Sequence, residues 1–416
     1  MNVLVIGSGG REHAIVKKLK ESRRAGKIYC LPGNAGISLD AECVPGSVMD
    51  FDHIVKVCKE KEIGLCFVAP DDPLGAGLVN RLNAENIRAF GPAKEAAIIE
   101  SSKAFSKAFM ERHNIPTAKY RTFTDEKAAK EYIISAKYPL VVKADGLALG
   151  KGVIICQSAD EANAAVTQIM AEKAFGSAGD TIVIEEFLEG KEVTVLTFTD
   201  GKTVKCMPSS QDHKKAFDGD KGLNTGGMGA FSPSLAYTKE IAAETMEKII
   251  IPTIKGLKEE NREFKGVIYF GLMLTKDGAK VLEYNARFGD PETQCVLPLL
   301  KTDFLDVIDA VIDGKLSDLE LTWENKASAV VILASGGYPE KYEKGFPITI
   351  GTLDGVSVFH SGTAFKGGIL VTNGGRVLGV AATGTGIATV RETIYRNIQN
   401  ISFKNMYYRK DIGIKL

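Results

Sequence analysis

Short apolar runs alternate with amphipathic segments along the first hundred residues. Strands are predicted at residues 3–6, 28–31 and 64–69, each closed by glycine or proline, and a helix is predicted from about residue 11 to 20. Strands that alternate with helices and end in Gly/Pro loops indicate a parallel sheet, in which ligands bind at the carboxyl ends of the strands. We therefore predict an N-terminal α/β domain over residues 1–100.

The pattern beyond residue 93 predicts a second α/β block. It indicates one long helix over 93–113, then strands at 119–123, 139–144, 153–156 and 181–187, with helices at 126–136 and 159–173. Strand pairs are expected around Asp200-Gly201 and Asp277-Gly278. A polar, glycine-rich loop over 208–229 and a helix over 238–260 lie between these pairs. This block forms a predicted second domain, residues 101–325.

A smaller α+β domain is predicted for residues 326–416. Strands are expected at 328–333, 356–360 and 369–372, and a last helix at 387–399. Asn373-Gly374-Gly375 predicts a hairpin that pairs the strand at 369–372 with residues 377–383.

Composition removes several classes of function. The chain has 416 residues, a length typical of about three domains, and 52 basic residues balance 52 acidic ones. That balance argues against nucleic-acid binding, and no apolar run approaches the ~18 residues of a membrane span. The seven cysteines contain no C-x-x-C pair, and no signal peptide precedes residue 11. These features predict reduced thiols and a cytoplasmic location.

The turn Gly7-Ser8-Gly9-Gly10 joins the first strand to the first helix. Such a turn can present backbone N–H groups to an anion, or it can serve packing alone, and the sequence leaves both readings open. A dinucleotide site is disfavoured because Glu12 stands where the fingerprint needs glycine.

Residues 143–152 form a lysine-bearing glycine segment between two strands. It is not a P-loop, because Gly146 and Gly150 are only four positions apart and Gly152 follows Lys151. A glycine hairpin can still fold over polyphosphate; the alternative is a mobile surface hairpin.

Alternation along a strand places Glu283, Asn285 and Arg287 on one face. Carboxylate and amide oxygens suit Mg²⁺ together with substrate phosphates, and an adjacent arginine suits a transferring phosphoryl group. A solvent-facing polar stripe is the alternative. Taken alone, Glu185 and Glu186 at the end of a strand are predicted to be solvated.

The long loop carries Asp212, His213 and Lys214 at one end and Asn224 and Thr225 near the other. Such a loop can order a substrate, although His213 could equally be a solvated loop residue.

These motifs, in this order, resemble the ATP-grasp superfamily and, within it, the phosphoribosylamine–glycine ligases. The more specific resemblance rests on residues 7–13, 32–36, 143–152, 211–214, 224–229 and 285–293 and covers essentially the whole chain. It implies a multidomain ATP-grasp architecture in which residues 118–188 form a mobile lid that carries the hairpin. It also implies a monomeric enzyme of purine biosynthesis that uses ATP with Mg²⁺ or Mn²⁺ to join glycine to phosphoribosylamine through glycyl phosphate.

The resemblance also implies roles for individual residues. Arg287 and Lys143 would be catalytic, and Glu283 and Asn285 would hold the metal. Contacts to ATP would come from Lys103, Lys143, Gly150, Lys151, Gly152, Glu185, Glu186, Leu188 and Glu192. Contacts to glycine or the amino sugar would come from Gly9, Gly10, Asp212, His213, Lys214, Asn224, Thr225, Arg287, Asp290 and Pro291.

Two positions depart from the family pattern. Asp71 stands where a glutamate is usual, and Leu223 stands where a proline is common. Two other functions remain open at this point: an ATP-grasp ligase for a different acid, and a nucleotide-binding regulatory protein that has lost catalysis.

Overall fold

The computed structural model describes residues 1–147 and 152–414, so Gly150 and Lys151 of the predicted hairpin lie outside the described residues. The N-terminal sheet is parallel, with strand order β3-β2-β1-β4-β5. Its strands are β1 (Asn2–Gly7), β2 (Ile28–Pro32), β3 (Glu42–Cys43), β4 (Ile63–Val68) and β5 (Ala89–Phe90), and its helices are α1 (Gly10–Lys20), α2 (Phe51–Glu60), α3 (Asp71–Ala76) and α4 (Leu78–Ala84). The predicted parallel sheet is confirmed.

The predicted helix over 93–113 is two helices, so that prediction was wrong. These are α5 (Lys94–Ser101) and α6 (Lys103–Arg112). Ser102 has extended backbone between them, and its hydroxyl accepts a hydrogen bond from the backbone N–H of Phe105. A serine that caps a helix competes with continuation of the preceding one, which explains the break.

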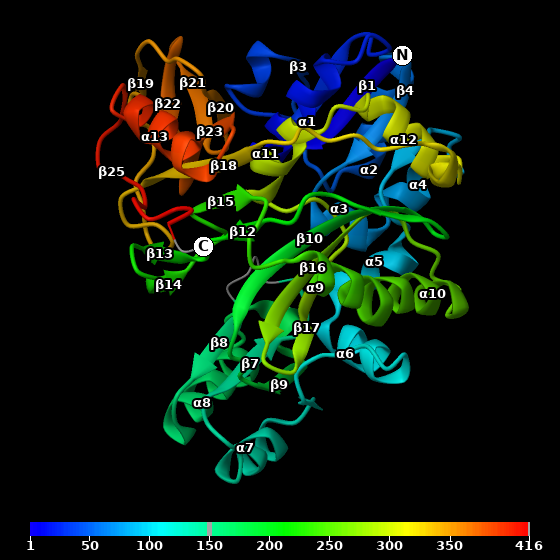
Figure 1. Cartoon of the computed structure of the whole chain (residues 1–416), viewed down its shortest axis with the longest axis vertical. Coiled ribbons are helices and arrows are strands. Elements are labelled where there is room, and N and C mark those ends of the chain that lie inside the picture. The colour runs from blue at the N-terminus through cyan, green and yellow to red at the C-terminus, as the bar shows by residue number, and fades with distance from the viewer. Residues whose placement is uncertain (148–151, 415–416) are drawn as a thin grey trace.

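An antiparallel sheet with order β6-β9-β7-β8 forms a separate body at the lower end of Figure 1. It contains β6 (Tyr120–Phe123), α7 (Glu126–Ile134), β7 (Leu140–Ala144), β8 (Val153–Cys156), α8 (Ala159–Val166) with a π-helical turn (Thr167–Ala171), and β9 (Ile182–Glu186). Its buried apolar residues pack in a cluster of their own, including Ile133, Val142 and Ile184. This body has its own core.

A second antiparallel sheet, of order β11-β10-β16-β17, faces that body. Its strands are β10 (Lys191–Asp200), β11 (Val204–Cys206), β16 (Lys265–Thr275) and β17 (Gly278–Asn285). Both predicted strand pairs are confirmed. A helical stretch formed by α9 (Lys239–Thr245), a π-helical turn (Met246–Ile250) and α10 (Ile251–Glu259) precedes β16.

The polar loop contributes strands to the C-terminal sheet. Its short strands are β12 (Gln211–Asp212), the pair β13 (Lys215–Phe217) and β14 (Lys221–Asn224), and β15 (Gly229–Ser232). The antiparallel order is β12-β15-β18-β23-β20, with β18 (Ala327–Ser335), β20 (Ser357–His360) and β23 (Arg376–Gly384), and β25 (Met406–Tyr407) also pairs with β18. One sheet therefore joins segments on both sides of residue 325.

The predicted hairpin at Asn373-Gly374-Gly375 was wrong. The strand β22 (Ile369–Thr372) pairs with β21 (Thr363–Lys366), whereas β23 pairs with β18 and β20. The short strands β19 (Thr349–Ile350) and β24 (Ile401–Ser402) pair separately, and α13 (Ile387–Ile398) packs on the sheet. The turn signal was real, but it connects strands that belong to different sheets.

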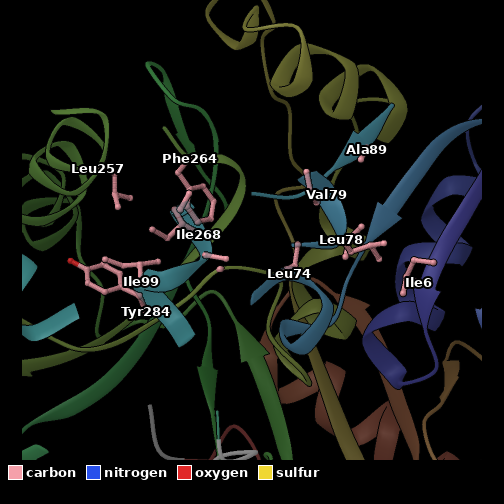
Figure 2. Packing of buried hydrophobic residues seen from close by; sticks show 14 of the residues in the cluster. Ile6, Leu74, Leu78, Val79, Ala89, Ile99, Leu257, Phe264, Ile268 and Tyr284 are labelled. Carbon is pink, nitrogen blue, oxygen red and sulfur yellow. The ribbon is translucent and has the colours of Figure 1, made fainter. Parts of the chain in front are cut away.

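Two hydrophobic clusters join the N-terminal domain to the central one. In Figure 2, Ile6, Leu74 and Leu78 of the N-terminal domain belong to the same cluster as Phe264 and Tyr284 of the central domain. The second cluster adds α11 (Glu292–Val296) and α12 (Phe304–Ile312). These parts form a common base, to which the body built on β6–β9 is attached. In the described part of the chain, none of the helices is both long enough and apolar enough to cross a membrane.

Candidate active site

Lys143 and Glu185 lie on the inner face of the sheet that contains β7 and β9. Val142 and Ile184 of the same strands point into that body's core, so alternation directs Lys143 and Glu185 the other way. Lys143 Nζ is 2.9 Å from Glu185 Oε2 and donates a 3.3 Å hydrogen bond to the carbonyl of Leu282 in β17. The lysine strand and the Glu283 strand therefore face each other directly.

Lys214 connects two acidic residues of the opposite sheet. Its ammonium contacts Glu192 Oε1 and lies 3.5 Å from Glu283 Oε1. Burial opposes the charge of Lys214, but the two carboxylates outweigh it and raise the pKa of the lysine well above its ordinary value. Burial likewise opposes ionisation of Glu283, yet Lys214, Lys143 and nearby cations lower its pKa to about 2. Glu283 is thus an ionised carboxylate surrounded by positive charge.

Lys103 lies where the glycine segment leaves β7. Its ammonium donates to the carbonyl of Gly146 at 2.9 Å. The carboxylate of Asp145 accepts hydrogen bonds from the Ala104 backbone N–H at 2.6 Å and from the Ser102 hydroxyl at 3.1 Å. The start of the glycine segment is thereby fixed to the first turn of α6. Burial and the charge of Lys143 lower the pKa of Lys103, against the pull of Glu283.

Arg287 points toward the N-terminal domain. Its guanidinium is 2.9 Å from Glu100 Oε1 and 3.8 Å from Asp71 Oδ2, and its buried Nε has no hydrogen-bond partner within the described residues. Burial raises the pKa of Glu100 to about 7 although Arg287 pulls it down. Asp71 therefore lies close enough to Arg287 for an electrostatic contact.

Asp290 lies between three segments of the chain. It accepts a 2.7 Å hydrogen bond from Gln294, and its Oδ1 is 3.3 Å from a guanidinium nitrogen of Arg376. A Cβ added at Gly9 would come within 3.2 Å of its other oxygen, and one at Gly10 would come within 2.5 Å of Gln294. The backbone N–H of Gly9 already donates to Glu12 at 2.6 Å. These contacts show that the glycine turn packs against Glu12 and Gln294, and they place that turn beside Asp290.

Asp212 and His213 face opposite ways. Lys214 and the carboxylates of Glu283 and Glu292 surround Asp212, and burial raises its pKa well above the ordinary value despite the lysine. The ring of His213 instead lies toward Arg409, and burial together with that arginine lowers its pKa to about 4.

The remaining substrate candidates lie at the base of the same loop. The backbone N–H and hydroxyl of Thr225 both donate to the carbonyl of Lys214 at 2.8 Å. Asn224 pairs with Lys215 across β13 and β14. The Cβ position of Gly227 comes within 3.4 Å of Asp212 and closer to Pro291, so Asp212, Pro291 and the loop are neighbours.

The nucleotide candidates on the segment that joins β9 to β10 each have separate surroundings. Glu186 accepts a 3.0 Å hydrogen bond from the backbone N–H of Lys119, Leu188 is buried, and Glu192 contacts Lys214. Gly152 is buried, and its carbonyl accepts a 2.8 Å hydrogen bond from the Ala144 N–H.

Comparison with known proteins assigns the chain to a family. Three family models match: the N domain (residues 1–100), the ATP-grasp (A) domain (residues 101–293) and the C domain (residues 328–415) of phosphoribosylglycinamide synthetase. A phosphoribosylamine–glycine ligase of Caldanaerobacter subterraneus is 48% identical over 414 residues, 99% of each chain. The chain belongs to the phosphoribosylglycinamide synthetase family.

Other members of the phosphoribosylglycinamide synthetase family extend the likeness. The trifunctional purine biosynthetic protein adenosine-3 of Gallus gallus is 49% identical over 420 residues, which are 99% of this chain and 42% of that protein. A crystal structure of the phosphoribosylamine–glycine ligase of Thermotoga maritima has a TM-score of 0.88 at 32% identity and covers 99% of this chain and 100% of that one. The multidomain ATP-grasp fold is thereby confirmed.

The residues of this phosphoribosylglycinamide synthetase family member fit a magnesium ion that is shared with a nucleotide. Among residues 1–147 and 152–414, no group of three or more His, Cys, Asp or Glu side chains could hold a metal alone. Mg²⁺ commonly takes one or two carboxylates and completes its shell with phosphates and water. The ionised Glu283, with Asn285 two residues on, provides such a partial set.

Sequence reasoning missed several residues at the site. Lys107 contacts Glu185, Glu100 contacts Arg287, and Arg376 contacts Asp290. Lys107 and Glu100 lie on helices and are buried, but a charged residue within a helical pattern is usually solvated. Arg376 comes from the C-terminal sheet, and no spacing in the sequence relates it to residue 290.

Proposed function

We propose that this chain ligates glycine to 5-phosphoribosylamine at the expense of ATP, giving glycinamide ribonucleotide, ADP and phosphate in purine biosynthesis. The observation that carries the proposal is the direct contact between the Lys143 strand and the strand that bears Glu283. An ATP-grasp enzyme requires a nucleotide between those two elements, and the full-length family match supports the choice of acid and amine.

The chemistry divides into two steps. A carboxylate is a poor acyl donor, because its oxide is a poor leaving group. Attack of a glycine carboxylate oxygen on the γ-phosphorus of ATP expels ADP and forms glycyl phosphate. The amine of phosphoribosylamine then attacks the acyl carbon, phosphate departs, and the nitrogen loses a proton. Positioning and neutralisation of charge account for most of the catalysis in such transfers.

We assign the phosphate contacts to Lys103 and Lys143, and further contacts with ATP to Gly150, Lys151 and Gly152. Glu185, Glu186 and Leu188 would line the adenine site, and Glu192 would meet the ribose. Glu283 and Asn285 would hold Mg²⁺ or Mn²⁺, which when bound neutralises phosphate charge. Arg287, whose Nε is free of hydrogen bonds within the described residues, would stabilise the transferring phosphoryl group.

We assign glycine and the amino sugar to the space bounded by Asp290 and the long loop. The residues that would contact them are Gly9, Gly10, Asp212, Lys214, Asn224, Thr225, Arg287, Asp290 and Pro291. We propose that His213 supports the loop without contacting the substrate, because its ring lies toward Arg409.

Residues 118–188 are proposed to move as a lid over the nucleotide. Two facts support this proposal: the body has its own core, and polar contacts such as those of Lys143 and Asp145 join it to the base. The proposed domain limits are 1–100, 101–325 and 326–416. We further propose a monomer in the cytoplasm, the latter because all seven cysteines are free thiols.

Glycine-dependent formation of ADP and phosphate in the presence of phosphoribosylamine tests the proposal. Wild-type protein should release phosphate only when glycine, amine and nucleotide are all supplied. Equal turnover with another small carboxylic acid and none with glycine would instead identify a different ATP-grasp ligase. Nucleotide binding without turnover on any acid would indicate a regulatory protein.

A further inference from the structure

Lys107 is a buried lysine outside the set assigned above. It lies on α6 and is 2% exposed. Its ammonium lies 3.2 Å from Glu185 Oε1 and donates a 2.7 Å hydrogen bond to the hydroxyl of Thr117. Burial lowers its pKa to about 8, against the pull of Glu185. A buried ammonium of this kind is tolerated only when it is paired and hydrogen-bonded, as Lys107 is by Glu185 and Thr117.

The acidic partner is Glu185, whose single carboxylate contacts two lysines. Lys143 contacts Oε2 and Lys107 contacts Oε1, and both lysines are buried. The contact between Lys107 and Oε1 lacks hydrogen-bond geometry, so this buried oxygen has no hydrogen-bond partner within the described residues. Glu185 therefore has neutralised charge and an unused acceptor.

The second lysine becomes necessary once a nucleotide binds. In the proposed function Lys143 turns toward the phosphates of ATP. Without Lys107, this movement would leave the Glu185 carboxylate buried beside the nucleotide with no counter-charge, and burying an unpaired charge is unfavourable. Lys107 is fixed apart from that movement, because Thr117 in turn donates a 2.7 Å hydrogen bond to the carbonyl of Val281 in β17.

The free acceptor of Glu185 has a consequence for the choice of base. An ionised carboxylate can only accept hydrogen bonds. Adenine presents an amino donor next to its N7, whereas guanine presents a carbonyl acceptor at the same place. The free acceptor Oε1 of Glu185, on the inner face of the sheet, would thus accept a hydrogen bond from the adenine amino group. Opposite guanine it would face another acceptor.

We propose that Lys107 is a positioning residue that holds the Glu185 carboxylate in place beside the base as its counter-charge, so that the site selects adenine over guanine nucleotides. The inference rests on the proposed function only in that ATP binds between the two sheets. It assigns Lys107 no contact with the substrate and no part in the transfer itself.

The test is a comparison of Lys107→Met with wild type by calorimetric titration of ATP and GTP, each with Mg²⁺ and without glycine or phosphoribosylamine. Methionine keeps the length and removes the charge. We expect the Kd for ATP to rise about 10- to 100-fold, as expected when one partner of a buried charge pair is lost. The Kd for GTP should change little, so the ratio of the two constants should fall.

Three further variants make the outcome specific. Lys107→Arg keeps the charge and should restore much of the preference for ATP, and Lys94→Met, at an exposed lysine of α5, should leave both constants unchanged. Thr117→Val removes the hydroxyl that accepts from Lys107 and donates to the Val281 carbonyl, and it should give a smaller loss in the same direction. It serves as the test if Lys107→Met does not fold.

Unchanged Kd values for ATP and GTP in the folded charge-removing or Thr117 variant would overturn the inference. A parallel loss of affinity for both nucleotides would also overturn it, because that result indicates a general structural role. The ligase assay separates the two proposals. Wild type that lacks glycine-dependent turnover rejects the proposed function, whereas an active wild type with an unaltered Lys107→Met rejects only the role of Lys107.

Discussion

Replacing Glu283 by glutamine removes one negative charge from the proposed metal site and preserves its shape. The pKa of Glu283 falls from an ordinary 4.5 to about 2. With about 1.4 kcal/mol for each tenfold change, the surrounding cations favour the ionised form by at most roughly 3 kcal/mol. The side chain is 36% exposed, and solvent screening reduces this figure to about 1–2 kcal/mol.

The sign of this contribution is set by the depressed pKa. Because the folded pKa lies below the unfolded one, the stabilisation is present above about pH 4.5 and is lost as the pH falls toward 2. Glu283→Gln should therefore lower the free energy of unfolding at pH 7 by about 1–2 kcal/mol, as measured by urea titration. The difference from wild type should shrink as the pH falls through this range.

The loss of activity should be much larger than the loss of stability. Even partners that only orient metal ligands cost roughly 10- to 100-fold when removed, so loss of a direct ligand should reduce glycine-dependent ADP release at low Mg²⁺ by at least that factor. Raising the Mg²⁺ concentration should recover part of it. Glu247→Gln, at an exposed glutamate of the nearby helical stretch, should be indistinguishable from wild type. Normal turnover and an unchanged Mg²⁺ dependence in Glu283→Gln would refute the assignment.

Three further outcomes are expected. Arg287→Lys should lower kcat about 10²- to 10³-fold in the ADP-release assay, because lysine cannot present a planar fork to the phosphoryl group; a change confined to KM would contradict that role. Asp145→Ala removes the acceptor for the Ala104 N–H. It should cost about 1 kcal/mol in thermal unfolding and weaken ATP binding; an effect on stability alone would show that this hydrogen bond does not influence the nucleotide site. His213→Gln should reduce acid sensitivity. Burial beside Arg409 lowers the pKa of His213 to about 4, so the unfolded chain takes up a proton that the folded chain does not, and wild type should lose roughly 2–3 kcal/mol between pH 6.5 and 4. Equal slopes of stability against pH in the two proteins would contradict that account.

The parts of the site that sequence predicted are local. Glu283 and Asn285 share a face because they are two positions apart on one strand, and the glycine segment after Lys143 is recognisable from consecutive residues. The parallel order of the N-terminal sheet follows similarly from alternation of elements. Each of these inferences needs only neighbouring residues and the period of one element.

The parts that sequence missed depend on contacts across the chain. Lys107 and Glu185 are 78 positions apart, yet they meet at 3.2 Å, and nothing near either residue predicts the other. The hairpin predicted at Asn373 failed for a related reason. A turn signal reports a local change of direction, whereas pairing was decided by the register of β23 with β18 along its whole length.

The C-terminal sheet includes β12 and β15, which belong to the segment that also carries Asp212 and Lys214. On the ribosome, these two strands emerge about a hundred residues before β18, the strand on which they must pair. The nascent chain can thus fold the N-terminal domain and the body built on β6–β9 before β18, the strand on which the Asp212 segment pairs, has been synthesised. The active site should therefore form only after the final quarter of the polypeptide has been synthesised. A premature stop in that quarter would yield a protein whose proposed ATP site is folded but whose proposed site for glycine and the amino sugar is not.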